Sequence, residues 1–428
     1  MNSPLFMDNI LAAALPVAKD WLEKIINDKC PNSNGKLRNV TCQLIGEGKG
    51  FLSHITRVTL DWDPNCSTGL DHLPRGVVFK LPTLDKMATL RKQDSALFTN
   101  EMLVQFHNQE CRAYEFLNKY PPTPIPLAKC FFAREATEKD FGIIVLEDLS
   151  DVAVSINFGS HPMRFTHFSE DIRLDQMLEF AKNIGQLQAY GFNHSNFKSY
   201  FLPKVTNPFE TMLSNMSTNL NDIRQDIGCS EVPYSNMHFQ RILEIAQNKL
   251  RIYEDPSVFG FIPVIALGDV QSNNILWYRD SNGSATSKIA AFLDFQMSHI
   301  GACMNDISKL MINSLPVAER RTHQNAIIEE YLASLVKNVT STNYLPSVTL
   351  DGVSSEQTIV TREEAYKIHS ILVMHFLCIG IAIFPMIKNL MQTAGASSNE
   401  IRERLNRTLA LIDEIDIDEL SGIPQDCV

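Results

Sequence analysis

Three polar residues, each placed after an apolar stretch, have the types and the order that phosphoryl transfer requires. Asp269 and Asn274 stand in the segment ALGDVQSNNILW with D-x-x-x-x-N spacing, and Asp294 follows in AFLDFQ. An aspartate can orient an attacking hydroxyl, while an asparagine and a second aspartate can hold Mg²⁺. The alternative is that Asp269 and Asn274 are turn residues and that Asp294 ends a strand. The occurrence of all three in order favours a catalytic base, Asp269, and two metal ligands.

Residues that could grip the phosphates of a nucleotide precede this segment. Gly46, Gly48 and Gly50 lie in IGEGKGFLS, directly before a predicted strand, and a glycine-rich loop can cover phosphates. Lys80 stands at the end of the apolar run VVFKLP, where its ammonium group could bind them. The alternatives are a flexible hairpin for the glycines and an edge-strand lysine that points to water. These four residues are candidate cofactor-binding residues, and ATP is the expected cofactor.

Glu110 is predicted to pair with Lys80. In the helix predicted over residues 97–120, Glu110 shares one face with Phe106 and Leu117, because residues at this spacing align along a helix. A carboxylate on an apolar stripe must find a cation, since burying it alone costs a large desolvation free energy. Lys80 is the candidate cation.

The segment VLEDLS follows the last strand of the β-rich part of the chain. A connection at this place would offer backbone groups to the adenine ring of a nucleotide. Glu147 and Leu149 are therefore added to the candidate cofactor-binding residues, although side-chain types say little about hydrogen bonds made by the backbone.

Hydrophobic periodicity divides the chain into three expected regions. Residues 1–35 contain an amphipathic helix, predicted over 9–28, that serves for packing. Residues 36–149 are mostly strands with one prominent helix and form a small N-lobe. Residues 150–428 are mostly helical and form a larger C-lobe, interrupted by a short β segment that carries Asp269. The expected fold class is α+β, with a small β-rich lobe followed by a larger helical lobe.

Individual elements follow from shorter patterns. ITRVTLDW alternates as a strand does, and AKCFFARE with FGIIVLEDL reads as a hairpin around ATEKD. LDQMLEFAKNIGQLQAYGFNH, MHFQRILEIAQNKLRIYED and most of the chain from Met304 onward have helical spacing.

The net charge and the cysteine pattern indicate where the protein is located and which partners it does not bind. The chain has 428 residues and a net charge of −11, and such an acidic surface repels nucleic acid as a general partner. Nine scattered cysteines without a CxxC pair indicate a reducing compartment, and the N-terminus lacks a basic signal-peptide region, so we expect a cytoplasmic protein. The apolar stretch at residues 371–387 contains His375 and Pro385, and it predicts a buried core helix and no membrane association.

LGDVQSNNILW followed by LDFQMSHIGACMNDISKL resembles the CHK-kinase-like group, which includes the ecdysteroid kinases of insects and a large nematode branch. These proteins are related to choline kinases and aminoglycoside phosphotransferases. GFLSHITRVTLDW, VVFKLP, HNQECRAYEFL and LEDL match in the same order, so the resemblance covers about residues 40–385. Among the branches of this group, the motifs of this chain most resemble those of the nematode branch.

The resemblance implies a bilobal protein-kinase-like fold and ATP-dependent phosphorylation of a hydroxyl group on a small molecule. By motif position it implies a catalytic base at Asp269, Mg²⁺ ligands at Asn274 and Asp294, and a phosphate-gripping pair at Lys80 and Glu110. Asp306 falls on a further family aspartate with a structural role. A steroid-like alcohol, a glucoside and an amino alcohol all remain open as the acceptor, and the sequence does not indicate the oligomeric state.

One position departs from the family pattern. The family has His-Gly-Asp where this chain has Leu267-Gly268-Asp269, and leucine cannot make the hydrogen bond with which the histidine supports the loop. We therefore expect a less rigid loop and lowered activity. The alternative hypothesis is a nucleotide-binding pseudokinase with weak or no transfer activity.

Overall fold

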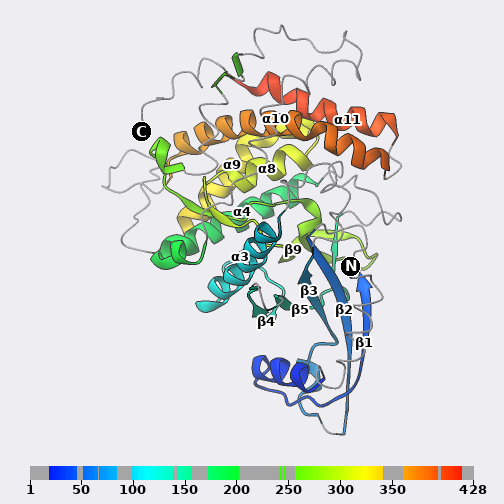
Figure 1. The fold of residues 1–428 in the computed structure, drawn as a ribbon. Helices are drawn as coiled ribbons and strands as arrows, with labels where there is room; N and C mark the ends of the chain where they lie inside the picture. The colour runs from blue at the N-terminus through cyan, green and yellow to red at the C-terminus, as the bar shows by residue number, and fades with distance from the viewer. Residues whose placement is uncertain are drawn as a thin grey trace. The chain divides into compact units, whose positions relative to one another are not determined.

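The described part of the chain is mixed α and β and divides into two compact units. The first unit comprises Met1–Cys111 and Ala128–Asp151, and the second comprises Arg112–Leu127 and Val152–Val428. In this computed structural model the described residues are 19–45, 52–65, 67–83, 99–137, 140, 142–156, 172–201, 241–242, 244–245, 256–340, 360–393 and 397–416. Figure 1 shows the ribbon of each unit with the larger elements labelled.

The first unit is built on a five-stranded antiparallel sheet. Its strands are β1 (Leu37–Ile45), β2 (Ser53–Trp62), β3 (Gly76–Pro82), β4 (Cys130–Arg134) and β5 (Ile143–Glu147). Their order in the sheet is β1-β2-β3-β5-β4, so β3 is an inner strand. The sequence predicted strands at β2 and β3 and a hairpin of β4 with β5, and the structure confirms all three.

Apolar side chains from a helix at residues 19–29 pack on this sheet. Leu22 and Ile26 of the helix form one core cluster with Val77 and Phe79 of β3. Burial of these side chains from water is what holds the helix on the sheet. The amphipathic helix predicted over 9–28 is thus present from residue 19, and its earlier residues lie outside the described part of the chain.

Helix α3 (Asn100–Lys119) follows β3, close to the bounds predicted from its periodicity. A short 3-10 turn, η1 (Leu70–His72), lies between β2 and β3. Residues of α3 up to Cys111 belong to the first unit.

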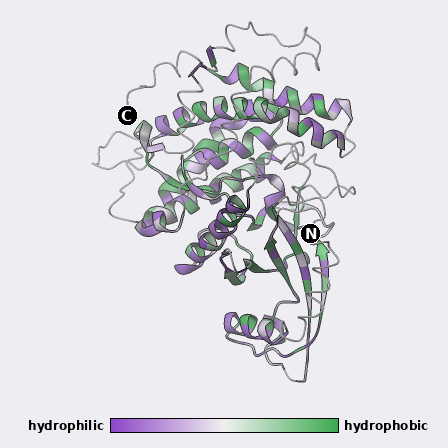
Figure 2. Ribbon diagram, in the orientation of Figure 1, coloured by the Kyte–Doolittle hydropathy of each residue, from purple (hydrophilic) through white to green (hydrophobic). Residues whose placement is uncertain are grey.

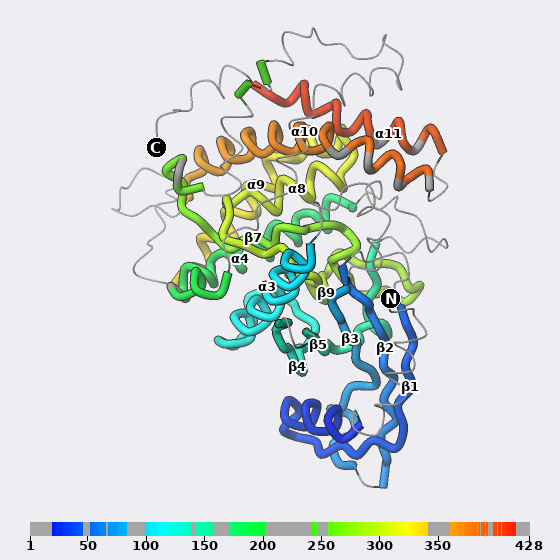
Figure 3. The backbone as a smooth tube through the Cα atoms, in the orientation of Figure 1, coloured from blue at the N-terminus to red at the C-terminus, as the bar shows by residue number. Residues whose placement is uncertain are grey.

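Helices dominate the second unit. They are α4 (Leu174–Asn193), α8 (Asn305–Ser314), α9 (Val317–Asn338), α10 (Arg362–Thr393) and α11 (Ser398–Leu409), with short 3-10 turns η3 (Ser195–Ser199), η5 (Pro256–Phe259), η6 (Ser272–Asn274) and η7 (Ala410–Glu414). Helix α4 packs against α9, and α10 lies beside α11, as the tube in Figure 3 shows. Hydrophobic and hydrophilic residues alternate along these helices in Figure 2, as they do on helices that turn one face to a core.

Two small sheets interrupt the helices of the second unit. One has the order β6-β8-β9, from β6 (Ala153–Ser155), β8 (Ile275–Arg279) and β9 (Ala285–Phe292), and the other joins β7 (Val264–Ala266) to β10 (His299–Gly301). The sequence predicted the central β segment but not β6 and β10. The fold class predicted from sequence, an antiparallel N-terminal sheet followed by a helical part, is confirmed.

Helix α10 contains the apolar stretch that could be mistaken for a membrane span. By length and composition the segment Arg362–Ala382 is apolar enough to cross a membrane, but 67% of it is buried inside the protein. Such burial fits the core helix that was predicted. The helix predicted for MHFQRILEIAQNKLRIYED lies mostly outside the described residues.

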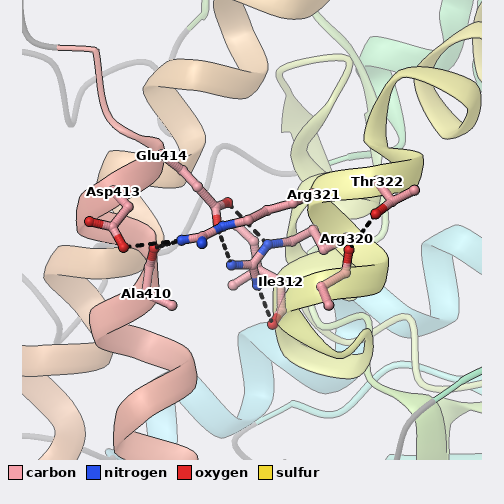
Figure 4. A network of polar contacts seen from close by, with 8 residues as sticks. Ile312, Arg320, Arg321, Thr322, Ala410, Asp413 and Glu414 are labelled. Carbon is pink, nitrogen blue, oxygen red and sulfur yellow. Dashed lines mark hydrogen bonds and ion pairs between the residues drawn. The ribbon is translucent and has the colours of Figure 1, made fainter.

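The C-terminal turn η7 is fastened to α9 by ion pairs. Arg320 is fully buried, its Nη2 lies 2.5 Å from Glu414 Oε1, and its Nη1 donates to the carbonyl of Ile312. Arg321 reaches the same carboxylate and Asp413, and Figure 4 shows the whole network. A charge buried to this extent requires its partner, so the end of the described chain is tied to the helical core.

Candidate active site

Lys80 lies on the inner strand β3 of the first unit. It is opposite Ile55 of β2 and Ile144 of β5, so both of its sides are covered by neighbouring strands. Only 8% of the residue is exposed. The alternative interpretation, an edge-strand lysine that points to water, is therefore wrong.

Glu110 of α3 is the partner of Lys80, as predicted. Lys80 Nζ lies 2.5 Å from Glu110 Oε2, and the exposed fractions of the two side chains are 10% and 1%. An ion pair at this depth costs free energy to desolvate, so it contributes little net stability to the fold. The contact is observed, and its predicted role in gripping phosphates stays a prediction.

His107 lies one turn before Glu110 and was not singled out from the sequence. Its Nε2 is 2.9 Å from the carbonyl oxygen of Arg134, and Gly142 packs so closely on the ring that a Cβ there would clash. Burial lowers the pKa of His107, and the positive charge of Lys80 lowers it further. A neutral imidazole beside the Lys80–Glu110 pair adds no second positive charge to it.

The segment after β5 uses some of its backbone groups inside the first unit. The Glu147 N–H donates to Lys129, and the Asp148 N–H donates to Gly76. Asp148 also places a carboxylate oxygen 2.7 Å from Nε of Arg57 on β2. Among the described residues nothing accepts a hydrogen bond from the Leu149 N–H.

Of the two residues predicted to face an adenine through their backbone, Leu149 is thus the one whose N–H is available, while that of Glu147 is used by the sheet. The three glycines predicted to cover the phosphates, Gly46, Gly48 and Gly50, lie outside the described residues.

In the second unit, the predicted catalytic segment leaves β7 through a tight turn at Gly268. Its φ is +79°, in the left-handed region that favours glycine, and a Cβ there would lie 2.1 Å from the Met297 carbonyl oxygen. Helix α8 supplies the anchor: Asp306 accepts hydrogen bonds from the N–H groups of Leu267 at 2.7 Å and Gly268 at 2.9 Å. The structural role that the resemblance implied for Asp306 has this geometric basis.

Burial raises the pKa of Asp306 to about 6, while the two backbone donors and the nearby ammonium of Lys309 favour the charged form. The residue is fully buried. Near neutral pH the carboxylate is therefore ionised and can accept both hydrogen bonds.

Asp269, the predicted base, is held by two donors on one oxygen. Lys309 Nζ lies 3.0 Å from Asp269 Oδ1, and Gln271 Nε2 lies 2.9 Å from the same atom. Neither donor was singled out from the sequence, since a lysine on a helix and a glutamine in a loop are ordinarily solvent-exposed. The side chain of Asp269 is thus held in place by Lys309 and Gln271, and its role as a base stays a prediction.

Asn274 is oriented by the same loop. Its Nδ2 donates to the Asp269 carbonyl oxygen at 3.0 Å, so its Oδ1 is the side-chain atom that remains for a metal ion. The strands β8 and β9 bring Asn274 beside the residue before Asp294, because the Leu293 N–H donates to the Asn274 carbonyl at 2.9 Å.

Asp294 adopts a backbone conformation that is uncommon for residues with a side chain. Its φ is +63°, and among the described residues it is the non-glycine position with positive φ. Such conformations gather at functional sites, because the surrounding structure must hold them against a local free-energy cost. The adjacent Phe295 is buried and packs edge-on to Tyr114, which fixes the chain directly after Asp294.

The donor set fits Mg²⁺. An amide oxygen of Asn274 and a carboxylate of Asp294 are hard oxygen ligands, and Mg²⁺ is commonly bound by one or two protein groups plus water and substrate phosphates. In the described part of the chain no group of three or more His, Cys, Asp or Glu side chains is placed to form an all-protein metal site. The two ligands thus fit a metal that arrives with a nucleotide, and their assignment stays a prediction.

A strand lysine paired with a helix glutamate in the first unit, and an Asp–Asn loop with a following aspartate in the second, are kinds of groups that kinases use. A family model described as "DUF1679: Uncharacterized oxidoreductase dhs-27" matches residues 22–414, and the chain belongs to this family. A Caenorhabditis elegans protein named as an uncharacterized kinase-like protein is 19% identical over 400 residues, covering 89% of this chain and 94% of that protein. The predicted resemblance to a nematode branch of kinase-like proteins is confirmed.

Solved structures with a similar course of the chain share little sequence. A putative aminoglycoside phosphotransferase from Ralstonia eutropha is 10% identical, with a TM-score of 0.46, and the match covers 93% of this chain and 98% of that one. An ethanolamine kinase from Plasmodium vivax is 14% identical, with a TM-score of 0.40, and the match covers 86% and 82%.

Proposed function

We propose that this protein is a phosphotransferase that uses Mg-ATP to phosphorylate a hydroxyl group of a small molecule. The observation that carries the proposal is the buried ion pair between Lys80 and Glu110, since a lysine held in this way is a means of presenting an ammonium group to phosphates. The loop with Asp269 and Asn274, whose backbone is fixed by Asp306, supplies the remaining groups.

In the proposed reaction the acceptor oxygen forms a bond to the γ-phosphorus of ATP. The bond between that phosphorus and the bridging oxygen breaks, and its electron pair leaves with ADP. Asp269 orients the acceptor hydroxyl and takes its proton. Mg²⁺, held by Asn274 and Asp294, would neutralise charge on the phosphate oxygens.

Three further candidate residues have a part in this proposal. Lys80 would bind phosphate oxygens while Glu110 keeps its ammonium in place. Leu149 would offer its backbone N–H to the adenine ring. The acceptor class stays open between a steroid-like alcohol, a glucoside and an amino alcohol.

A pseudokinase is the second candidate, and Leu267 is the observation that favours it. A chain of this kind would bind the nucleotide without transferring phosphate. The two candidates differ in turnover and not in nucleotide binding, so one pair of measurements separates them.

The family description contains the word oxidoreductase. Dinucleotide-dependent enzymes commonly bind their cofactor on a parallel sheet with a glycine-rich turn that opens a helix. In the described residues, the strands of the first unit pair antiparallel throughout. No observation in the described structure favours hydride transfer over phosphoryl transfer.

We also propose a cytoplasmic location. The support is the scattered pattern of the cysteines in the sequence. In the described part of the chain, six cysteines are free thiols: Cys30, Cys42, Cys111, Cys130, Cys303 and Cys378. Imaging of the tagged protein in cells tests the location.

The test of function measures binding and turnover on the same preparations. Thermal unfolding is followed with Mg-ATP, with ATP plus chelator, and for Asp294→Ala. A ligand at 100 times its Kd contributes about 2.7 kcal/mol, which shifts the midpoint of a chain this long by a few degrees. Transfer of labelled γ-phosphate into a small-molecule extract is then compared between the wild type and Asp269→Asn.

A magnesium-dependent shift with transfer that Asp269→Asn abolishes supports the kinase. A shift without transfer by either protein supports the pseudokinase. The absence of any magnesium-dependent shift at millimolar ATP contradicts both.

A further inference from the structure

Lys309 of α8 touches two consecutive residues of the catalytic segment. Its Nζ lies 2.8 Å from the carbonyl oxygen of Gly268 and 3.0 Å from Oδ1 of Asp269. It stands one helical turn after Asp306, so both side chains project from the same face of α8. Asp306 accepts a hydrogen bond from the N–H of Gly268, and Lys309 donates one to its carbonyl oxygen. One face of α8 therefore binds both backbone groups of the residue before Asp269.

The depth of the Lys309–Asp269 pair separates it from surface ion pairs. The exposed fractions of the two side chains are 16% and 18%. Exposed pairs of lysine and aspartate contribute little because water and salt screen them. A pair that is largely withdrawn from water is screened much less, so removal of the lysine changes both the orientation and the electrostatic surroundings of the carboxylate.

The contact also fixes which oxygen of Asp269 is anchored. Lys309 and Gln271 both donate to Oδ1, at 3.0 and 2.9 Å. Two donors on one oxygen oppose rotation of the carboxylate about its Cβ–Cγ bond. A base must lie within hydrogen-bond reach of the proton it accepts, and a misplacement of about one ångström can cost a hundredfold in rate.

We propose that Lys309 is a positioning residue for Asp269: it fixes the plane of the carboxylate and offsets its negative charge while a phosphoryl group is transferred. The proposal rests on the proposed phosphotransferase function. It also accounts for the departure at Leu267, because this loop is held by backbone and carboxylate contacts from α8 that do not need a side-chain donor at position 267.

The charge balance supports the second part of the role. Asp269 and Asp294 both carry carboxylates, and the nucleotide that they are proposed to serve carries several negative charges. The ammonium of Lys309 lies against Asp269 and reduces the repulsion between this base and the transferred group. The effect belongs to the transfer step and should appear in kcat, with little change in the binding of ATP.

The experiment measures ADP release from Mg-ATP with water as the acceptor, for the full chain and a set of variants. Lys309→Met removes both the donor and the charge, Lys309→Gln keeps an N–H donor toward Gly268 without charge, and Lys309→Arg keeps the charge. Lys337→Met, at an exposed position near the end of α9, is the matched control. Urea unfolding shows which variants are folded under the assay conditions.

We expect Lys309→Met and Lys309→Gln to lower kcat by about tenfold to a hundredfold, with the KM for ATP within about twofold of the wild type. Lys309→Arg should recover a large part of kcat, and Lys337→Met should equal the wild type. If Lys309→Met does not fold, Lys309→Gln carries the test.

A kcat within twofold of the wild type in folded Lys309→Gln and Lys309→Met overturns the positioning role, provided that Asp269→Asn is inactive. A raised KM with unchanged kcat also overturns it, because that result assigns Lys309 to nucleotide binding. If the wild type exceeds Asp269→Asn neither in ADP release nor in transfer of labelled phosphate into the small-molecule extract, the phosphotransferase function fails and the role of Lys309 fails with it.

Discussion

The carboxylate of Asp306 accepts a hydrogen bond from the backbone N–H of Leu267, with its Oδ2 2.7 Å from that nitrogen. This contact restrains the position where the resemblance led us to expect a histidine, and it does so through the backbone N–H, which every residue type except proline provides. The expectation of a less rigid loop was drawn from the leucine side chain alone. The structure adds a restraint that is independent of that side chain, and Leu267 itself is buried.

The first prediction concerns Asp306→Asn. The asparagine keeps one acceptor oxygen but places an NH₂ donor against a backbone N–H of Leu267 or Gly268. A buried donor left without an acceptor costs about 1–3 kcal/mol, so we expect a loss of that order in the free energy of unfolding, together with a strong loss of turnover. Urea unfolding and ADP release measure the two effects. An Asp306→Asn protein with wild-type turnover would show that this anchor is dispensable for the loop.

The second prediction concerns the ion pair of the first unit. Glu110→Gln leaves the Lys80 ammonium buried without its counter-charge, and breaking a buried pair in this way costs about 3–5 kcal/mol. We expect lowered stability and weakened ATP binding, measured by urea unfolding and by calorimetric titration with Mg-ATP. Glu115→Gln, at an exposed position of the same helix, is the control and should change neither quantity.

The double variant Glu110→Leu, Lys80→Met separates folding from binding. Apolar residues of similar volume often replace a buried ion pair without loss of stability. We expect this protein to fold and to have lost ATP binding. Unchanged nucleotide affinity in Glu110→Gln, or ATP binding by the double variant, would mean that the pair serves the fold alone.

The Lys80–Glu110 contact could be predicted from the sequence because a buried carboxylate needs a cation and Lys80 was the candidate. Glu110 lies on an apolar helix stripe and needs a cation, and Lys80 is an isolated cation in an apolar strand. Sheet order was not predictable from these residues, yet it is what shows that β3 is an inner strand and that Lys80 is buried.

The second half of the site was predictable only in part. The spacing of Asp269 and Asn274 identified the loop, since the residues that define it are close in sequence. Lys309 comes from a helix much later in the chain, and a lysine in a helix carries no signal of its partner. Its contact with Asp269 depends on how α8 packs against the turn at Gly268, which is a tertiary relationship.

The strands β6 and β10 were missed for a simpler physical reason. Each has three residues, which is too short to show the alternation of buried and exposed side chains that identifies a strand. They pair with β8 and with β7; β7 is as short, but it lies within the longer apolar run FIPVIAL that precedes the predicted catalytic loop.

The third prediction concerns pH and His369 of α10. This histidine is buried, with Nδ1 2.8 Å from Ser308 Oγ, and burial lowers its pKa to about 4. The charge of Glu414 acts to raise the pKa and that of Arg320 acts to lower it. A histidine with a lowered pKa contributes stability that is present above its unfolded pKa of about 6.5 and is lost as the pH falls toward 4.

We therefore expect the free energy of unfolding to fall more in the wild type than in His369→Gln between pH 7.5 and 4.5. The difference between the two losses should approach about 3 kcal/mol at the lower pH. Urea unfolding at several pH values gives the two slopes. The raised pKa of Asp306 has the opposite effect, but it is common to both proteins and cancels in the comparison. Parallel pH dependences of the two proteins would show that His369 is not held in its neutral form.

The last prediction concerns the ion pair that fastens η7 to α9. Arg320 is fully buried and its guanidinium is bound by Glu414, whereas the neighbouring pair of Arg321 with Asp413 is about half exposed. Glu414→Gln leaves a buried guanidinium without its counter-charge, and we expect a loss of about 3–5 kcal/mol in the free energy of unfolding. Asp413→Asn removes a carboxylate from the same turn at an exposed position, where water already screens the charge, so it should cost little.

Urea unfolding of both variants at one pH and one salt concentration makes the comparison, and repetition at high salt tests its cause. The effect of Glu414→Gln should largely persist in high salt, because salt screens a buried pair much less than an exposed one. Equal losses in the two variants would indicate that the turn is held by its backbone and by the apolar side chains of Leu411 and Ile412, and not by the buried charge of Arg320.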